Sequence, residues 1–207
     1  MNIAPTSLSR VQHARKRALW LVAATFVAAF FTVAPAWPGE GTGEETIEVA
    51  GFLCIAIAVV GRTWCTLYIG GRKKRELVTD GPYSLSRNPL YVFSVVGALG
   101  IGMTSGSFIM GALLAAAAGA ILDSVIRREE AYLSEQFPGT YVAYKRSVPR
   151  WLSVHARWHD ADSMEIRPRL VLTTFRDASV MLLALPVAEG IEMLRYVADL
   201  PVLLYLP

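Results

Sequence analysis

Residues 90–121 read LYVFSVVGALGIGMTSGSFIMGALLAAAAGAI, an apolar stretch without a charged side chain. One spanning helix needs only about 20 residues, so this stretch is too long for a single crossing. The polar break TSGS at residues 104–107 is typical of a turn. The stretch therefore predicts a helical hairpin that returns to the side it entered from. Each arm has about 15 residues, or about 22 Å, so we expect it to be tilted or only partly inserted.

Composition agrees with a membrane protein. Hydrophobic residues make up 54% of the chain, charged residues make up 18%, and the mean hydropathy is +0.40. Soluble domains carry about 25% charged residues. The net charge of +3 is too small to indicate a nucleic-acid partner. Both cysteines, Cys54 and Cys65, lie in one apolar segment, where a single helix cannot join them in a disulfide.

Two apolar runs precede the hairpin, at residues 18–34 and 47–69. A basic stretch comes before the first run, and residues 72–75 (RKKR) follow the second, whereas residues 35–48 between them contain no Lys or Arg. By the positive-inside rule both basic flanks are cytoplasmic. The first run could instead be a cleaved signal peptide, since residues 34–36 (APA) resemble a cleavage site.

The remainder alternates between polar and apolar segments. Residues 123–153 predict a helix, a turn at Pro138 and Gly139, and a second helix, and residues 155–169 predict a charged loop. Residues 171–207 are apolar, but four charges fall on one helical face at Glu189, Glu192, Arg195 and Asp199. This pattern leaves a fifth span, an interfacial helix and a lid all open.

Residues 77–91 (LVTDGPYSLSRNPLY) form the first motif with possible chemistry. The residues DGP at 80–82 predict a turn, and Asn88 followed by Pro89 predicts a helix start, with Asn88 as the N-cap. The N–H groups of a helix start can receive a carboxylate. The alternative is an ordinary loop in which Arg87 and Tyr91 anchor the chain at the membrane surface.

Residues 127–150 (RREEAYLSEQFPGTYVAYKRSVPR) form the second motif. On the predicted helix, Leu122, Ile126 and Leu133 belong to the apolar face. Glu129 and Glu130 sit on its two shoulders, so the period does not say which one points inward. The alternative is a solvated charged face whose ion pairs contribute little.

In this order and spacing, the two motifs resemble the C-terminal half of the isoprenylcysteine carboxyl methyltransferase and phospholipid methyltransferase superfamily. The family pattern is Gly-Pro-Tyr, Arg-His-Pro-x-Tyr, Glu-Glu and then Phe-Gly-x-x-Tyr-x-x-Tyr. The resemblance covers about residues 60–152, including Arg62 and Trp64. Two departures stand out: Asn88 replaces the family's His, and the Gly after Phe is shifted by one position to Gly139.

The resemblance implies an all-α polytopic membrane bundle of about four to five membrane helices with a small cytoplasmic catalytic part. It divides the chain into a basic N-terminus (1–17), a methyltransferase-like domain (18–152) and a C-terminal extension (153–207). It implies S-adenosylmethionine as cofactor, bound by Tyr83, Arg87, Asn88, Pro89, Tyr91, Glu129 and Glu130. Our hypothesis is that one glutamate holds the cofactor's ammonium and the helix start at Asn88 receives its carboxylate. The candidate catalytic residues are Arg87, Glu130 and Arg150.

Function remains open between three classes. The favoured class is methyl transfer, with carboxyl-O-methylation of a lipid-like or prenylated acceptor preferred and phospholipid N-methylation as the alternative. We expect the protein to lie in the bacterial inner membrane with its active site on the cytoplasmic side, and we expect no metal ion. A nicotinamide-dependent reductase on the same scaffold and a non-catalytic membrane protein are the others. No G-x-G-x-x-G follows a predicted strand, so a soluble Rossmann architecture is not expected.

Overall fold

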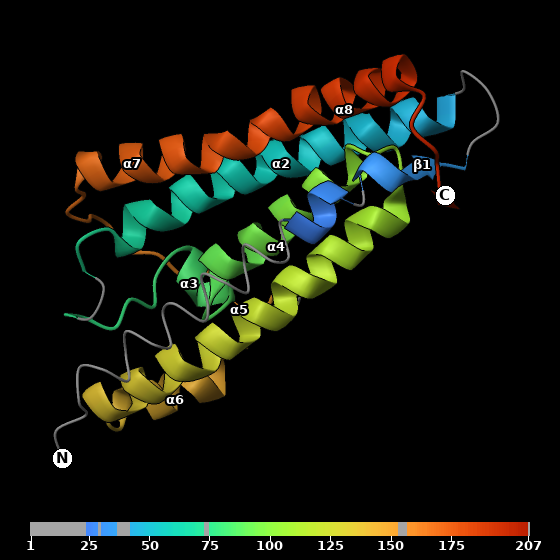
Figure 1. The fold of residues 1–207 in the computed structure, drawn as a ribbon. Coiled ribbons are helices and arrows are strands. Elements are labelled where there is room, and N and C mark those ends of the chain that lie inside the picture. Colours follow the sequence, from blue (N-terminus) through green and yellow to red (C-terminus); the bar gives the residue numbers. More distant parts are fainter. Residues whose placement is uncertain (1–23, 29, 37–41, 73–74, 153–156, 207) are drawn as a thin grey trace, which may run out of the picture.

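The computed structural model describes residues 24–28, 30–36, 42–72, 75–152 and 157–206. It is a bundle of long helices with short helices gathered at one end (Figure 1). Residues 24–28 and 30–32 are helical, as expected within the first apolar run. The rest of that run before residue 24, residue 29 and the basic N-terminus lie outside the described residues.

Helix α2 (Thr42–Ile69) confirms the second predicted span and begins a few residues earlier than expected. Glu44 and Glu45 occupy its first turn, where carboxylates complement the helix dipole. Among the described residues, three helical stretches are long and apolar enough to cross a membrane: Gly43–Ile69, Phe108–Gln136 and Pro168–Ala198. The all-α membrane fold predicted from the sequence is therefore confirmed.

The predicted hairpin is formed by α4 (Pro89–Met103) and α5 (Phe108–Gln136), joined by a turn at residues 104–107. Ser107 caps α5 by accepting a hydrogen bond from the Met110 amide at 3.3 Å. The expected end of the second arm near residue 121 is wrong, because α5 continues without interruption through the Arg-Arg-Glu-Glu motif. Residues 121–136 contain no Gly or Pro and are mostly good helix formers, so nothing stops the helix.

Two short helices complete the end of the bundle at which α2 finishes. Helix α3 (Pro82–Leu85) follows the predicted turn, in which Gly81 has a φ of 58° and packs under the Tyr68 ring. Helix α6 (Thr140–Ser147) begins after Gly139, whose φ is 89°, at the predicted break. Positive φ favours glycine at both positions.

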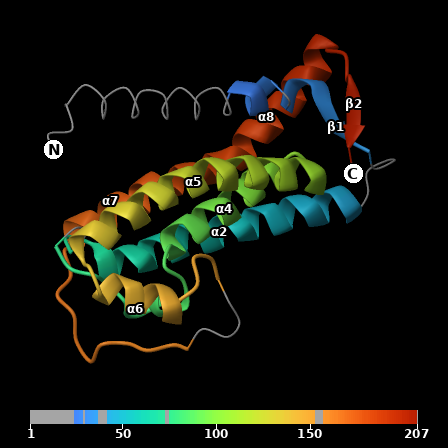
Figure 2. The same ribbon diagram turned by 90° about the horizontal axis from the view of Figure 1, so that it is seen from below.

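The C-terminal tail forms α7 (Pro168–Ser179), the 3₁₀ segment η1 (Val180–Leu183) and α8 (Ala184–Ala198). Helix α7 and η1 run antiparallel to α2 and pack against it, whereas α8 diverges from α2 (Figures 1 and 2). Ala178 of α7 is buried against Ile55 and Val59 of α2. Pro186 lies in the first turn of α8, where a missing N–H costs little. Asp199 adopts the left-handed conformation that ends α8, so it does not extend the predicted charged helical face.

The far end of the tail pairs with the chain near the first helical segment. Strand β1 (Val33–Pro35) pairs in parallel with β2 (Leu204–Leu206), and Arg195 donates a hydrogen bond to the Val33 carbonyl at 2.5 Å. These short strands were not expected from the sequence. They hold residues 204–206 at the end of the bundle opposite to α6 (Figure 1).

Close helix contact at Gly102 predicts that this position tolerates no side chain. A Cβ at Gly102 would lie 2.5 Å from Gly111 Cα, whereas a Cβ at Gly119 would meet only Val95 Cγ2 at 4.0 Å. Gly102→Val should therefore lower the free energy of unfolding in detergent by about 1–3 kcal/mol more than Gly119→Val. Dodecyl sulfate titration followed by circular dichroism measures the difference. Equal losses in the two variants would contradict the packing described for this hairpin.

Candidate active site

A cavity of about 610 Å³ opens at the end of the bundle where the short helices gather. Its walls come from the end of α2 with the following loop, from α3 and the start of α4, from the last half of α5, from α6 and from the start of α7. Residues far apart in the chain therefore meet here. Among those the sequence singled out, the cavity is lined by Tyr83, Arg87, Asn88, Tyr91 and Glu129.

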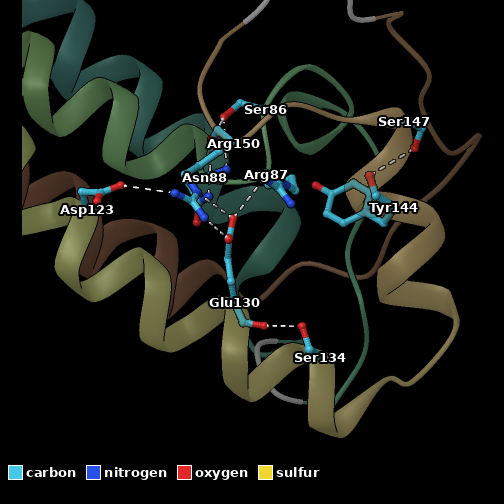
Figure 3. A network of polar contacts seen from close by, with 9 residues as sticks. All are labelled: Ser86, Arg87, Asn88, Asp123, Glu130, Ser134, Tyr144, Ser147 and Arg150. Carbon is cyan, nitrogen blue, oxygen red and sulfur yellow. Dashed lines mark hydrogen bonds and ion pairs between the residues drawn. The ribbon is translucent and has the colours of Figure 1, made fainter.

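Glu130 lies behind the cavity wall and binds two arginines (Figure 3). The residue is only 5% exposed. Arg150 donates from Nη2 to Glu130 Oε2 at 2.7 Å and from Nε to Oε1 at 3.3 Å, and Arg87 Nη2 lies 3.4 Å from Oε1. A buried carboxylate requires such partners, because removing its hydration is costly. The helical period of the sequence did not show which of Glu129 and Glu130 points inward. In the fold, Glu129 lines the cavity and Glu130 is the buried counterion of the two arginines.

Hydrogen bonds from the first motif hold the segment after α6 in place (Figure 3). Ser86 Oγ and Asn88 Nδ2 both donate to the Arg150 carbonyl, at 3.1 and 3.3 Å, and the Arg87 amide donates to the Pro149 carbonyl at 2.9 Å. The helix start at Asn88 and Pro89 is confirmed, but the Asn88 side chain makes no capping bond. Its amide is used to bind Arg150 instead.

Arg87 offers donors that the described residues do not satisfy. Its side chain is 10% exposed, and one terminal nitrogen, Nη2, meets Glu130. Nε and Nη1 are buried and have no hydrogen-bond partner among the described residues. Buried donors without partners are costly in a folded protein, so this arrangement is typical of a site that binds an anion.

Buried tyrosines form part of the wall next to Arg87. Tyr144 donates from its hydroxyl to the Tyr83 carbonyl at 2.6 Å. Burial raises the pKa of Tyr83 well above its ordinary value and raises the pKa of Tyr141 to about 12. Both phenols are therefore protonated near neutral pH and act as hydrogen-bond donors rather than as charged groups.

Several predicted site residues lie outside the cavity, and several lining residues were missed. Pro89, Glu130 and Arg150 do not line it. The missed polar lining residues include Arg128, whose place beside Glu129 in the second motif was a usable signal. Thr174 and Leu170 also line the cavity, from α7. Nothing in the sequence of the tail connected it to this site.

Comparisons with known proteins identify the family of this chain. Residues 47–140 match the family described as phospholipid methyltransferase. Protein-S-isoprenylcysteine O-methyltransferase of Schizosaccharomyces pombe is 34% identical over 107 residues, which are 48% of this chain and 45% of that protein. The chain belongs to this superfamily of membrane methyltransferases.

Two bacterial proteins are similar over more of the chain. Nickel-cobalt-cadmium resistance protein NccN of Alcaligenes xylosoxydans xylosoxydans is 32% identical over 205 residues, 99% of this chain and 95% of that protein. Cobalt-zinc-cadmium resistance protein CzcN of Cupriavidus metallidurans is 41% identical over 132 residues, 63% of this chain and 60% of that protein. The names of these two proteins refer to metal resistance and do not identify a reaction. Within the described ranges, no group of three His, Cys, Asp or Glu side chains is arranged to hold a metal ion. No solved structure matches the chain.

The buried network predicts a large stability cost when its central charge is removed. Glu130→Ala leaves Arg87 and Arg150 without their shared carboxylate and should lower the free energy of unfolding by about 3 kcal/mol. Glu135→Ala, at an exposed position on the same helix, should change it by less than about 0.5 kcal/mol. Thermal unfolding in detergent compares the two variants. Similar melting temperatures for both would show that Glu130 is not a structural counterion.

Proposed function

We propose that the protein is an S-adenosylmethionine-dependent methyltransferase that methylates a carboxylate on a lipid-like or prenylated acceptor. The observation that carries the proposal is the pairing of opposite charges across one cavity. Arg87, with two buried donors that lack partners, and Glu129 line this cavity from the two family motifs. A ligand with an amino-acid end carries both a carboxylate and an ammonium group, and such a pair of opposite charges can bind the two.

The residues of the cavity fit this cofactor. Arg87 Nε and Nη1 would bind its carboxylate, and Glu129 would bind its ammonium, which narrows the earlier hypothesis to one glutamate. The helix start at Asn88 adds the positive end of the α4 dipole beside Arg87. Tyr83, Tyr91 and Tyr132 supply aromatic walls. The volume of about 610 Å³ lies within the range that small-molecule sites occupy.

A carboxylate acceptor agrees best with the side chains present. The cofactor would supply a methyl group activated by a positively charged sulfur. The acceptor's carboxylate oxygen forms the new bond to carbon as the carbon–sulfur bond breaks, the electron pair stays on sulfur, and no proton moves. An amine acceptor, as in phospholipid N-methylation, must first lose a proton to a base. Asn88 cannot act as that base, and none of the described residues that line the cavity is a histidine.

Charge around the cavity supports a cytoplasmic active site. The end of α2, the last part of α5 and α6 lie at this end of the bundle (Figure 1). These elements and the loop after α2 carry five basic residues, Arg72, Arg75, Arg128, Lys145 and Arg146, so the positive-inside rule assigns this end to the cytoplasm. We therefore infer that the opposite end, with β1 and β2, faces the other side of the bacterial inner membrane.

This orientation predicts the behaviour of reporters fused to the C-terminus. Because β2 lies at the end opposite to the cavity, an alkaline phosphatase fusion after residue 207 should be active and a green fluorescent protein fusion should be dark. Fusions after Ser147 in α6 should behave in the reverse way. Fluorescence from the C-terminal fusion would contradict the proposed orientation.

Cofactor binding tests the proposed reaction directly. Purified protein in detergent should bind S-adenosylmethionine in calorimetry and should not bind reduced nicotinamide cofactor. Glu129→Gln and Arg87→Lys should each weaken binding about tenfold or more, because each loses a charge-assisted hydrogen bond. Glu135→Gln serves as the matched control and should bind as wild type. Binding of the nicotinamide cofactor alone by folded wild type would favour a reductase. Binding of neither cofactor would favour a non-catalytic role.

A further inference from the structure

Arg62 is a charged residue within the spanning helix α2, and its guanidinium is only partly satisfied. It lies seven positions before the end of that helix at Ile69, or about 10 Å further into the bundle. Its Nη1 donates to Ser94 Oγ on α4. Its Nε is buried and has no partner among the described residues. Ionisable groups at such depth are costly and are typical of functional sites.

The position of Arg62 relates it to the proposed active site. Three residues at the inner end of the cavity are Thr66 on α2, Tyr91 on α4 and Thr174 on α7. One helical turn deeper on the same three helices lie Arg62, Ser94 and Asp177. These three residues, the Arg62 layer, therefore lie beneath the floor of the cavity, towards the middle of the membrane.

The Arg62 layer has an incompletely paired positive charge. Asp177 is near enough for its charge to act on Arg62, but the described residues contain no ion pair between the two. Asp177 Oδ1 instead lies 3.1 Å from Arg176 Nη2, and its side chain is 59% exposed. A buried Arg62 Nε thus remains available to an anion that reaches this layer from the cavity.

A second cavity, of about 310 Å³, lies beyond the Arg62 layer, and all the described residues that line it are apolar. Ala98, one turn past Ser94 on α4, lines it together with Ala118 of α5 and Val187 of α8. Met181 packs against Gly97 between the Arg62 layer and this cavity. A thioether side chain adapts its shape readily, so a chain can pass beside it at little cost.

We propose that Arg62 and the apolar cavity form one binding site for the methyl acceptor, an amphiphile with a single carboxylate and a hydrocarbon chain. Arg62 binds the carboxylate beneath the cofactor cavity, and the chain occupies the apolar cavity between the first helical segment, α4, α5 and α8. The described lining residues are all apolar, and they lie at membrane depth near a cation with an unsatisfied donor, which matches such a molecule rather than a polar one. The inference rests on the proposed function, since it names the acceptor of that reaction.

The test uses full-length protein in detergent, tritiated palmitate as the probe, and unlabelled palmitate and methyl palmitate as competitors. Wild type should bind palmitate more tightly than its ester. Arg62→Met should weaken palmitate binding about tenfold or more while leaving the affinity for the ester and for S-adenosylmethionine unchanged. Arg62→Lys should restore part of the preference for the acid. Retained S-adenosylmethionine binding shows that each variant is folded.

Two further variants separate this role from a structural one. Asp177→Asn removes a competing negative charge and should leave palmitate binding equal or stronger. Ala118→Leu fills the apolar cavity and should weaken palmitate while shifting the preferred chain length to shorter acids, whereas Ala116→Leu, on an exposed face of the same helix, should do neither.

The proposal is overturned if wild type does not prefer the acid, if Arg62→Met binds palmitate as wild type does, or if Asp177→Asn reproduces the loss. Palmitate binding with these properties in a protein that fails to bind S-adenosylmethionine would support the acceptor site and contradict the proposed function instead.

Discussion

The architecture of the candidate site depends on one buried carboxylate. Glu130 of α5 binds Arg150 by two hydrogen bonds and lies 3.4 Å from Arg87, so it joins three segments that are distant in the chain. Without it, Arg87 would lose its carboxylate partner in a largely buried region, and Arg150 would keep only Asp123, whose Oδ1 lies 3.6 Å from Arg150 Nη1. Because Glu130 uses only Nη2 of Arg87, the two other guanidinium nitrogens keep unsatisfied donors at the cavity. The same interaction thus stabilises the fold and orients the group that we propose binds the cofactor.

Around this network, polarity changes with depth along the bundle. Charged and phenolic side chains line the cavity near α6, and the Arg62 layer lies one turn deeper. In the part of the chain that the structure describes, all residues that line the next cavity are apolar. Lipid provides no hydrogen bonds, so polar groups at depth must be satisfied by protein or by a ligand. This order of environments is complementary to the amphiphilic acceptor that we propose, whose carboxylate would meet the cation and whose hydrocarbon chain would lie in the apolar cavity.

The C-terminal tail is part of this arrangement although the matched family region ends at residue 140. Leu170 and Thr174 of α7 line the first cavity, and Val187 of α8 lines the second. Similarity to NccN extends over 99% of the chain and so includes this tail. The tail therefore contributes to the walls of both cavities, while the charged network of Arg87, Glu130 and Arg150 lies within the two motifs.

Local sequence patterns determined the elements of this protein. The apolar runs, the TSGS break and the glycines at 81 and 139 act over a few residues, so the hairpin, the turns and the helix start at Pro89 could all be predicted. The end of the hairpin arm was missed, because a change from apolar to charged residues does not itself break a helix. Only the tertiary structure decided that Glu130 is buried and Glu129 lines the cavity, that Asn88 binds Arg150, and that α7 closes the site. Those outcomes depend on packing and desolvation between segments far apart in the chain, which no local pattern encodes.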